Sequence, residues 1–155
     1  MSSLSRVEHS YGFFRYGVEC LEGYKIIAKE RPEPLDLFSL KSYLIARSIE
    51  LCYKAMLYEC GITERELKNT YGHNLKLISV HANALMRKHD LYQLCGDDDL
   101  VIWTMNDLYQ NKSLEYIQEG AKSAYEPEKF FELAVRISNS VERYLEDRLV
   151  KTYKK

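Results

Sequence analysis

Apolar residues recur at intervals of three and four positions through most of this chain, which is the spacing of one face of an α-helix. The longest such stripe lies between residues 35 and 60. Its members are Leu37, Leu40, Leu44, Leu51, Ala55 and Tyr58, widened by Ile45, Ile49, Cys52 and Met56. The alternation typical of strands is not sustained anywhere, and only 7 glycines and 3 prolines interrupt the 155 residues. The sequence therefore predicts an all-α fold.

Five main helices are predicted from these stripes and from the residues that start or end helices. They span residues 11–29, 35–60, 73–90, 98–109 and 127–151. A short extra helix is expected after Thr63, where Thr63 and Glu66 match the capping-box pattern. Because only short breaks separate the helices, we expect one domain over residues 1–155, folded as an up-and-down bundle of four to five antiparallel helices. Residues 1–10 and 151–155 are expected to be frayed.

The charges are almost balanced, with 22 basic and 23 acidic residues and a formal net charge of −1. A protein that binds nucleic acid over a wide surface usually carries a basic stripe, so this balance argues against such a protein and leaves room for a small local site. The chain also has 13 tyrosines. Tyrosine suits half-buried positions on helix flanks, and its ring also stacks on bases.

Several features indicate a cytoplasmic protein without a membrane segment. Residues 1–10 are polar and lack the apolar core of a secretory signal. No apolar stretch reaches the ~18 residues that indicate a membrane span. The cysteines are suited to buried positions in a reducing compartment, because none forms a C-x-x-C pair. They are Cys20, Cys52, Cys60 and Cys95.

Neither a metal nor a cofactor is predicted. His73, His81 and His89 repeat every eight residues, but eight helical residues separate neighbours by about 12 Å. Two ligands of one ion must each lie within about 2.1 Å of it, so this spacing does not form a metal site. The chain contains no glycine-rich phosphate loop and no dinucleotide fingerprint. The aspartates at 97–99 suit the positive end of the following helix.

Glu50 and Lys54 stand four residues apart on the most apolar predicted helix. Such a pair is either an ion pair on the surface or a small polar site within an otherwise buried helix face. His73 and Asn74 open the next helix, where free amides and the helix dipole can hold an anion such as phosphate. A cluster of these four residues could equally serve only to fix the joint between the two helices.

The stretch Ser48-Ile49-Glu50-Leu51-Cys52-Tyr53-Lys54-Ala55-Met56-Leu57, then Gly61, then Tyr71-Gly72-His73-Asn74-Leu75, resembles a HEPN domain. Met105-Asn106-Asp107-Leu108-Tyr109 is similar to a later helix end of that family. The resemblance covers about residues 35 to 110. It implies a helical bundle, often dimeric. Some members are metal-independent ribonucleases with an R-x(4–6)-H motif, whereas others bind nucleotides or accompany a small nucleotidyltransferase.

This chain departs from the ribonuclease motif, because seven residues separate Arg65 from His73 and no other Arg-His pair has the required spacing. We therefore expect a non-catalytic HEPN-like protein that forms a homodimer and binds a nucleotide, RNA or a partner protein. The partner would be a small nucleotidyltransferase or a component of a toxin-antitoxin system.

The expected ligand-binding residues are Glu50, Lys54, Tyr53, Tyr71, His73 and Asn74, with the two tyrosines stacking on a base. The alternative is a metal-independent ribonuclease that uses His73 with a distant arginine, Arg47 or Arg65. A third hypothesis is a pure interaction module, such as an antitoxin-like or regulatory subunit.

Overall fold

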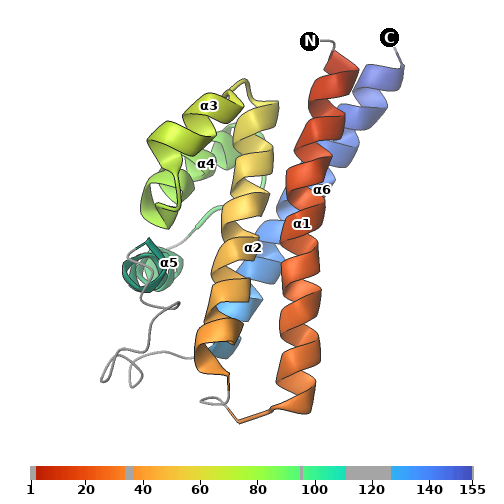
Figure 1. Cartoon of the computed structure of the whole chain (residues 1–155). Coiled ribbons are helices and arrows are strands. Elements are labelled where there is room, and N and C mark those ends of the chain that lie inside the picture. The colour runs from red at the N-terminus through yellow and green to blue at the C-terminus, as the bar shows by residue number, and fades with distance from the viewer. Residues whose placement is uncertain (1–2, 34–36, 95, 111–126, 155) are drawn as a thin grey trace.

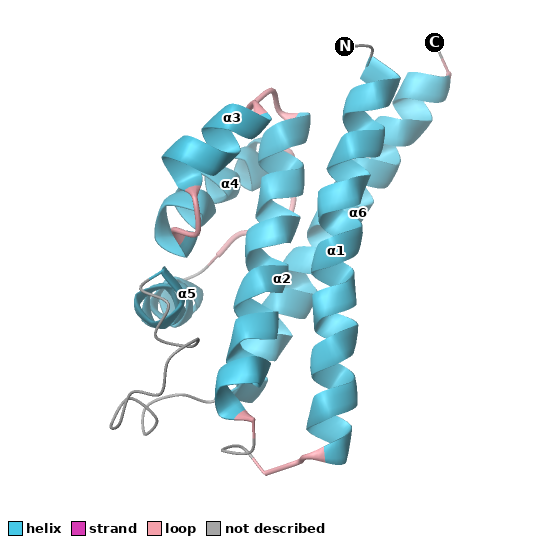
Figure 2. Ribbon diagram, viewed as in Figure 1, coloured by secondary structure: helices cyan, strands magenta, loops and turns pink. Residues whose placement is uncertain are grey.

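The structure is a computed structural model that describes residues 3–33, 37–94, 96–110 and 127–154. Its elements are α1 (Ser3–Glu30), α2 (Phe38–Glu59), α3 (Glu64–Glu66), the π-helical segment η1 (Leu67–Tyr71), α4 (Leu75–Lys88), α5 (Gly96–Gln110) and α6 (Pro127–Tyr153). Within the described ranges there is no strand, and helices account for nearly all of the chain (Figure 2). The predicted all-α fold is confirmed.

The three long helices lie side by side, with α1 antiparallel to both α2 and α6 (Figure 1). Both ends of the chain therefore lie at the same end of the bundle. The shorter helices pack on the side of α2 that faces away from α1, where α4 contacts α2 and α5 contacts α4. Figure 1 views α5 almost along its axis, so α5 crosses the long helices instead of running beside them.

Helix α2 is the centre of the core because α1, α4, α5 and α6 all pack against it. Every residue from Ser48 to Glu59 is buried, including charged ones. The large side chains with almost no exposure are Ile45, Ile49, Tyr53, Met56, Leu57, Leu75, Ile78, Met86, Ile102, Met105, Leu133 and Ile137. The charged side chains of a helix that is enclosed in this way need partners within the protein, because water does not reach them.

The predicted start of the first helix was wrong, because α1 begins at Ser3 instead of Tyr11. Val7 and Ser10 are fully buried, and they continue the core stripe of Phe14 toward the N-terminus with the same spacing of three and four. Ser10 contributes a hydroxyl that donates to Glu59 Oε2 at 3.2 Å. The expectation of a frayed segment over residues 1–10 is therefore corrected from residue 3 onward.

The other bounds differ by smaller amounts. Residues 35 and 36, the predicted start of the second helix, lie outside the described residues, as does Cys95. Leu37 and Leu40, which we placed in the core stripe, are 51% and 44% exposed. Leu37 has a positive φ of 51° just before α2, so the helical stripe cannot extend through it. At the other end of the chain, α6 extends to Tyr153, two residues into the tail expected to fray.

Close approach of α1 to α2 depends on a glycine. A Cβ atom at Gly17 would lie 3.0 Å from Cys52 Sγ and 3.2 Å from the carbonyl oxygen of Ser48. The two helix backbones therefore contact each other where α1 has no side chain. None of the described helices combines the length and the apolar character needed to cross a membrane.

Candidate functional site

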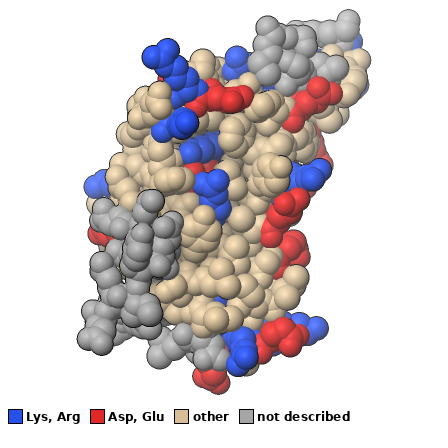
Figure 3. Space-filling view, viewed as in Figure 1, with Lys and Arg blue, Asp and Glu red and all other residues tan. Residues whose placement is uncertain are grey.

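A cleft of about 780 Å³ opens between α1, α2 and the α3–η1 segment. It is lined by Phe13, Arg47, Glu50, Leu51, Lys54, Glu64, Arg65, Leu67, Lys68, Asn69, Gly72 and His73. Figure 3 shows lysine and arginine side chains over α3 and the adjoining part of α2, with acidic side chains beside them. Four cations and two carboxylates line the cleft, so its electrostatic character favours an anion.

Glu50 lies at the base of this cleft and is fully buried. Its Oε1 accepts hydrogen bonds from Arg47 Nη1 at 3.0 Å and from Lys54 Nζ at 2.7 Å. Its Oε2 accepts from the Tyr109 hydroxyl at 2.5 Å and lies 3.0 Å from His73 Nδ1. A carboxylate offers about four acceptor positions, so these four contacts satisfy it. A carboxylate this deeply buried is tolerated only with such partners.

The charges around Glu50 keep it ionised. Burial alone would raise its pKa, but Lys54 and Arg47 together hold the pKa of Glu50 below its ordinary value. The effect on Tyr109 is the opposite, because burial and then the charge of Glu50 raise the pKa of its phenol. Tyr109 therefore stays protonated and can act as a donor to the carboxylate throughout the physiological pH range.

The sequence spacing on α2 brings the charged residues together. Arg47, Glu50 and Lys54 are separated by three and four residues, so all three project from one face of the helix. Lys54 Nζ also donates to the carbonyl oxygen of Gly72 at 2.6 Å. Lys54 thus ties α2 to the turn that follows η1, and the left-handed φ of 50° at Gly72 is a conformation that favours glycine.

That turn presents His73 to the cleft. The His73 side chain is 57% exposed even though its Nδ1 contacts the buried Glu50. Its ring also packs edge-on against Tyr109, with centroids 5.8 Å apart. When Nδ1 carries the proton and donates it to Glu50, the neutral ring keeps an unprotonated Nε2. The carboxylate therefore fixes the orientation of the imidazole and leaves its second nitrogen available to a ligand.

Two further cations lie at the rim of the cleft. Arg65 and Lys68 are exposed, and neither forms an ion pair with a carboxylate in the described part of the chain. The rim carboxylate Glu64, by contrast, lies 2.8 Å from Nε2 of His9 on α1. The Arg65 and Lys68 charges are thus the ones left for a ligand to neutralise.

The structure brings together some of the predicted site residues and separates others. Glu50, Lys54 and His73 meet in the cleft, and both arginines of the alternative hypothesis, Arg47 and Arg65, line it as well. The remaining three predicted residues serve the fold, and none of them lines this cleft. They are Asn74, which caps α4 by accepting from the Leu77 amide, Tyr53, which is fully buried, and Tyr71, whose hydroxyl lies 2.7 Å from His81 Nδ1.

Tyr109 and Lys68 were not predicted as site residues. Tyr109 belongs to the segment that carries the HEPN resemblance, and that segment was the available signal. Lys68 lies on the π-helical segment, whose register differs from that of an α-helix, so helical spacing gave no indication of where it would project.

Among the described residues, no group of three or more histidine, cysteine, aspartate or glutamate side chains is placed to hold a metal ion. A scan of protein-family models, a search of curated proteins and a search of solved structures each found no match for this chain.

Proposed function

We propose that the cleft binds the phosphate group of a nucleotide or of RNA. The observation that carries this proposal is the buried, ionised Glu50, which holds Arg47, Lys54 and His73 at the base of a cleft whose rim adds Arg65 and Lys68. Phosphate is recognised by such groups of preorganised cations and N–H donors.

Glu50 organises the cations without cancelling them. Its single charge faces two cations, Arg47 and Lys54, so the buried cluster stays positive before His73 is considered. The Arg47 side chain remains 31% exposed. Its guanidinium has five N–H groups, and the hydrogen bond to Glu50 uses one of those on Nη1. Donors therefore remain at the cleft surface for an incoming anion.

The resemblance to HEPN domains supports the same ligand class, because members of that family bind nucleotides or RNA. It is also the basis for proposing a homodimer and a nucleotidyltransferase or toxin-antitoxin partner. The even charge balance of the chain supports a local phosphate site and disfavours an extended nucleic-acid surface.

The proposal is tested by thermal-shift and calorimetric titrations with tripolyphosphate, ATP and a short single-stranded RNA. We expect saturable binding that weakens about two- to fivefold in Lys68→Gln, which removes one exposed charge. Lys29→Gln is the matched control, since Lys29 is an exposed lysine near the opposite end of α1. The proposal is rejected if none of the three ligands binds, or if Lys68→Gln and Lys29→Gln lose equal amounts of binding affinity.

The contact between His73 and Glu50 favours a second candidate, a metal-independent ribonuclease. In this reaction Nε2 of His73 would take the proton of a ribose 2′-hydroxyl while the 2′-oxygen attacks the adjacent phosphorus. The bond from phosphorus to the 5′-oxygen would break, and the 5′-oxygen would take up a proton from water. The cations of the cleft would stabilise the added charge on the phosphate. This candidate needs no R-x(4–6)-H motif, because Arg47 and Arg65 reach the same cleft from elsewhere in the chain.

Cleavage of single-stranded RNA in the presence of EDTA tests this second candidate. Activity that disappears in His73→Ala and persists in His81→Ala would support it, because His81 lies on α4 and is hydrogen-bonded to Tyr71. A wild-type protein that binds RNA without cleaving it would leave only the binding function.

A further inference from the structure

A second hollow continues the cleft along the groove between α1 and α2. It has a volume of about 390 Å³ and shares Arg47 and Leu51 with the first. Two aromatic side chains line it, Tyr16 from α1 and Tyr43 from α2. The two hollows are therefore adjoining parts of one groove, cationic at the α3–η1 end and aromatic at the other.

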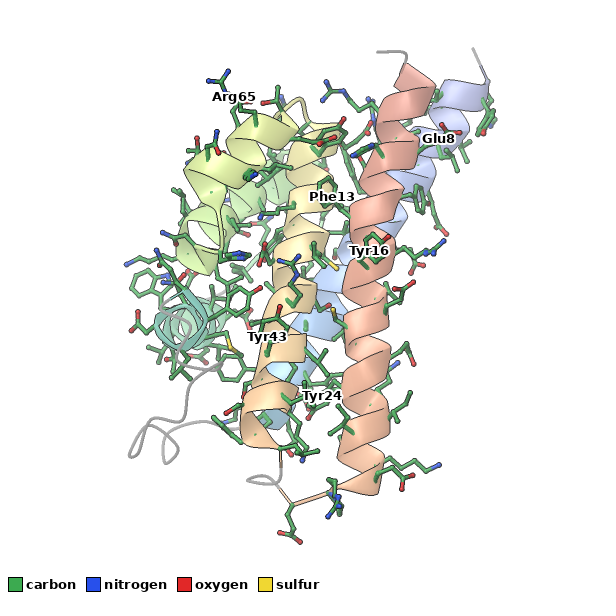
Figure 4. The ribbon with its side chains drawn as sticks, viewed as in Figure 1. Glu8, Phe13, Tyr16, Tyr24, Tyr43 and Arg65 are labelled. Atoms are coloured by element: carbon green, nitrogen blue, oxygen red, sulfur yellow. The ribbon has the colours of Figure 1, made fainter. Side chains whose placement is uncertain are left out.

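The aromatic end presents ring surface to an incoming ligand. Tyr16 is 59% exposed, so its ring is accessible to a ligand in the hollow. Figure 4 shows Phe13 and Tyr16 on α1 and Tyr43 on α2, all on the face of the bundle that looks toward the viewer. Tyr43 is half-buried and its ring packs against that of Tyr109, with centroids 5.8 Å apart. Because Tyr109 is hydrogen-bonded to Glu50, this contact joins the Tyr43 ring to the cluster around Glu50.

The charge pattern of the second hollow differs from that of the first. Its carboxylate, Glu19, is paired with Arg15 at 3.2 Å. Arg47 is its cation, and it lies at the junction of the two hollows. An arginine between an aromatic hollow and a cationic cleft is placed to contact a phosphate that links two nucleosides.

The length of the groove is sufficient for a polymer. Tyr43 and Lys54 are eleven residues apart on one helix, which corresponds to about 16 Å. Successive nucleotides in one strand of a duplex advance about 3.4 Å each, so the groove extends over several stacked nucleotides. Bases can reach the tyrosine rings only when they are not paired within a duplex.

From this arrangement we infer that the ligand is a single-stranded oligonucleotide, with phosphates in the cationic cleft and at least one base stacked on Tyr16 or Tyr43. This inference rests on the proposed phosphate-binding function and adds a base-binding subsite to it. A strand carries phosphates on both sides of each base, whereas a free nucleotide carries them on one side only.

The experiment compares the affinities of single-stranded hexaadenylate RNA, ATP and tripolyphosphate for four proteins. They are the wild type, Tyr16→Ala, Tyr16→Phe and Tyr153→Ala. Tyr153 is the matched control, since it is 66% exposed near the end of α6. Tyr16→Phe keeps the ring and removes only the hydroxyl.

We expect the wild type to bind the hexamer more tightly than ATP. Tyr16→Ala should weaken hexamer binding by about fivefold or more, the effect of one lost base stack. Its affinity for tripolyphosphate should not change, and Tyr16→Phe and Tyr153→Ala should match the wild type with all three ligands.

Two results would overturn the inference. If tripolyphosphate binds and Tyr16→Ala leaves the hexamer affinity unchanged, the base subsite is absent and the phosphate site stands alone. If the wild type binds neither tripolyphosphate nor the hexamer, the proposed function fails and the subsite fails with it.

Discussion

Tyr109 on α5 donates its hydroxyl hydrogen to Glu50 on α2, a buried hydrogen bond between residues 59 positions apart in the sequence. The bond joins the crossing helix α5 to the carboxylate that organises the cleft. It also supplies the one hydroxyl donor among the four partners of Glu50, since the others are nitrogen groups of arginine, lysine and histidine. The stability of the bundle and the geometry of the candidate site therefore depend on the same cluster.

Removing that hydroxyl should weaken the fold. We expect Tyr109→Phe to lower the free energy of unfolding by about 1.5–3 kcal/mol, the contribution of a hydrogen bond to a charged group. Tyr144→Phe is the control, because Tyr144 is also a buried tyrosine, but its hydroxyl lies 3.4 Å from the thiol of Cys60, a weak partner, so the change should cost less than about 1 kcal/mol. Urea denaturation measures the unfolding free energy of both variants. Equal losses of unfolding free energy would contradict the role given to Tyr109.

The acid sensitivity of the fold should depend on Glu50. Its pKa is below the ordinary value of 4.5 in the folded protein, so its contribution to stability is complete above pH 4.5 and is lost as the pH falls through the folded pKa. Between about pH 5 and pH 3 the wild type should therefore lose more unfolding free energy than Glu50→Gln. Urea denaturation at several pH values gives the two slopes, and parallel slopes would show that Glu50 does not titrate with a lowered pKa.

A buried and an exposed lysine–carboxylate pair, each with a spacing of four residues, should differ in their contributions to stability. Lys54→Met removes the cation that binds both Glu50 and the Gly72 carbonyl, and leaves a buried carboxylate short of a partner. We expect a loss of about 3–5 kcal/mol in unfolding free energy. Lys151→Met breaks the exposed pair with Asp147 on α6, where we expect little change. Similar effects of both changes would mean that the Glu50 cluster contributes no more than a surface pair.

Two glycines of α1 should respond to alanine with opposite signs. At Gly17 the added methyl group would lie 3.0 Å from Cys52 Sγ and 3.2 Å from a backbone oxygen, so Gly17→Ala should destabilise the protein by about 1–3 kcal/mol. At Gly12 no atom lies within 4 Å of the added carbon, and Gly12→Ala should stabilise the helix by about 0.5–1 kcal/mol. Thermal unfolding measures the stability of each variant against the wild type. A stabilised Gly17→Ala would show that α1 and α2 are not in backbone contact.

The helices were predictable from the sequence because long apolar stripes determine which face of each helix is buried. The predicted segments 73–90, 98–109 and 127–151 correspond to α4, α5 and α6 with bounds shifted by a few residues. The start of α1 was missed because its first ten residues are polar overall, although Val7 and Ser10 continue the stripe. The crossing of α5 over the long helices was not predictable, because periodicity gives the buried face of a helix and not its angle to a neighbour.

The site was predictable in part for a similar reason. The i,i+4 spacing placed Glu50 and Lys54 together on one helix, and the turn at Gly72 placed His73 near them. Sequence spacing cannot show which distant side chains close the cluster, and Tyr109 comes from a helix that begins 46 residues after Glu50. Tyr53 was misjudged as a stacking residue because α2 is enclosed on all sides at that level, which leaves its ring fully buried.

The most direct test of the central claim is a nuclear magnetic resonance titration of the isotope-labelled protein with tripolyphosphate. We expect saturable shifts confined to residues 47–54 and 64–73, together with the His73 imidazole nitrogens, because these groups line the cleft that the Glu50 cluster organises. Shifts confined to the basic residues at 151–154, or no saturable shift at any residue, would contradict it.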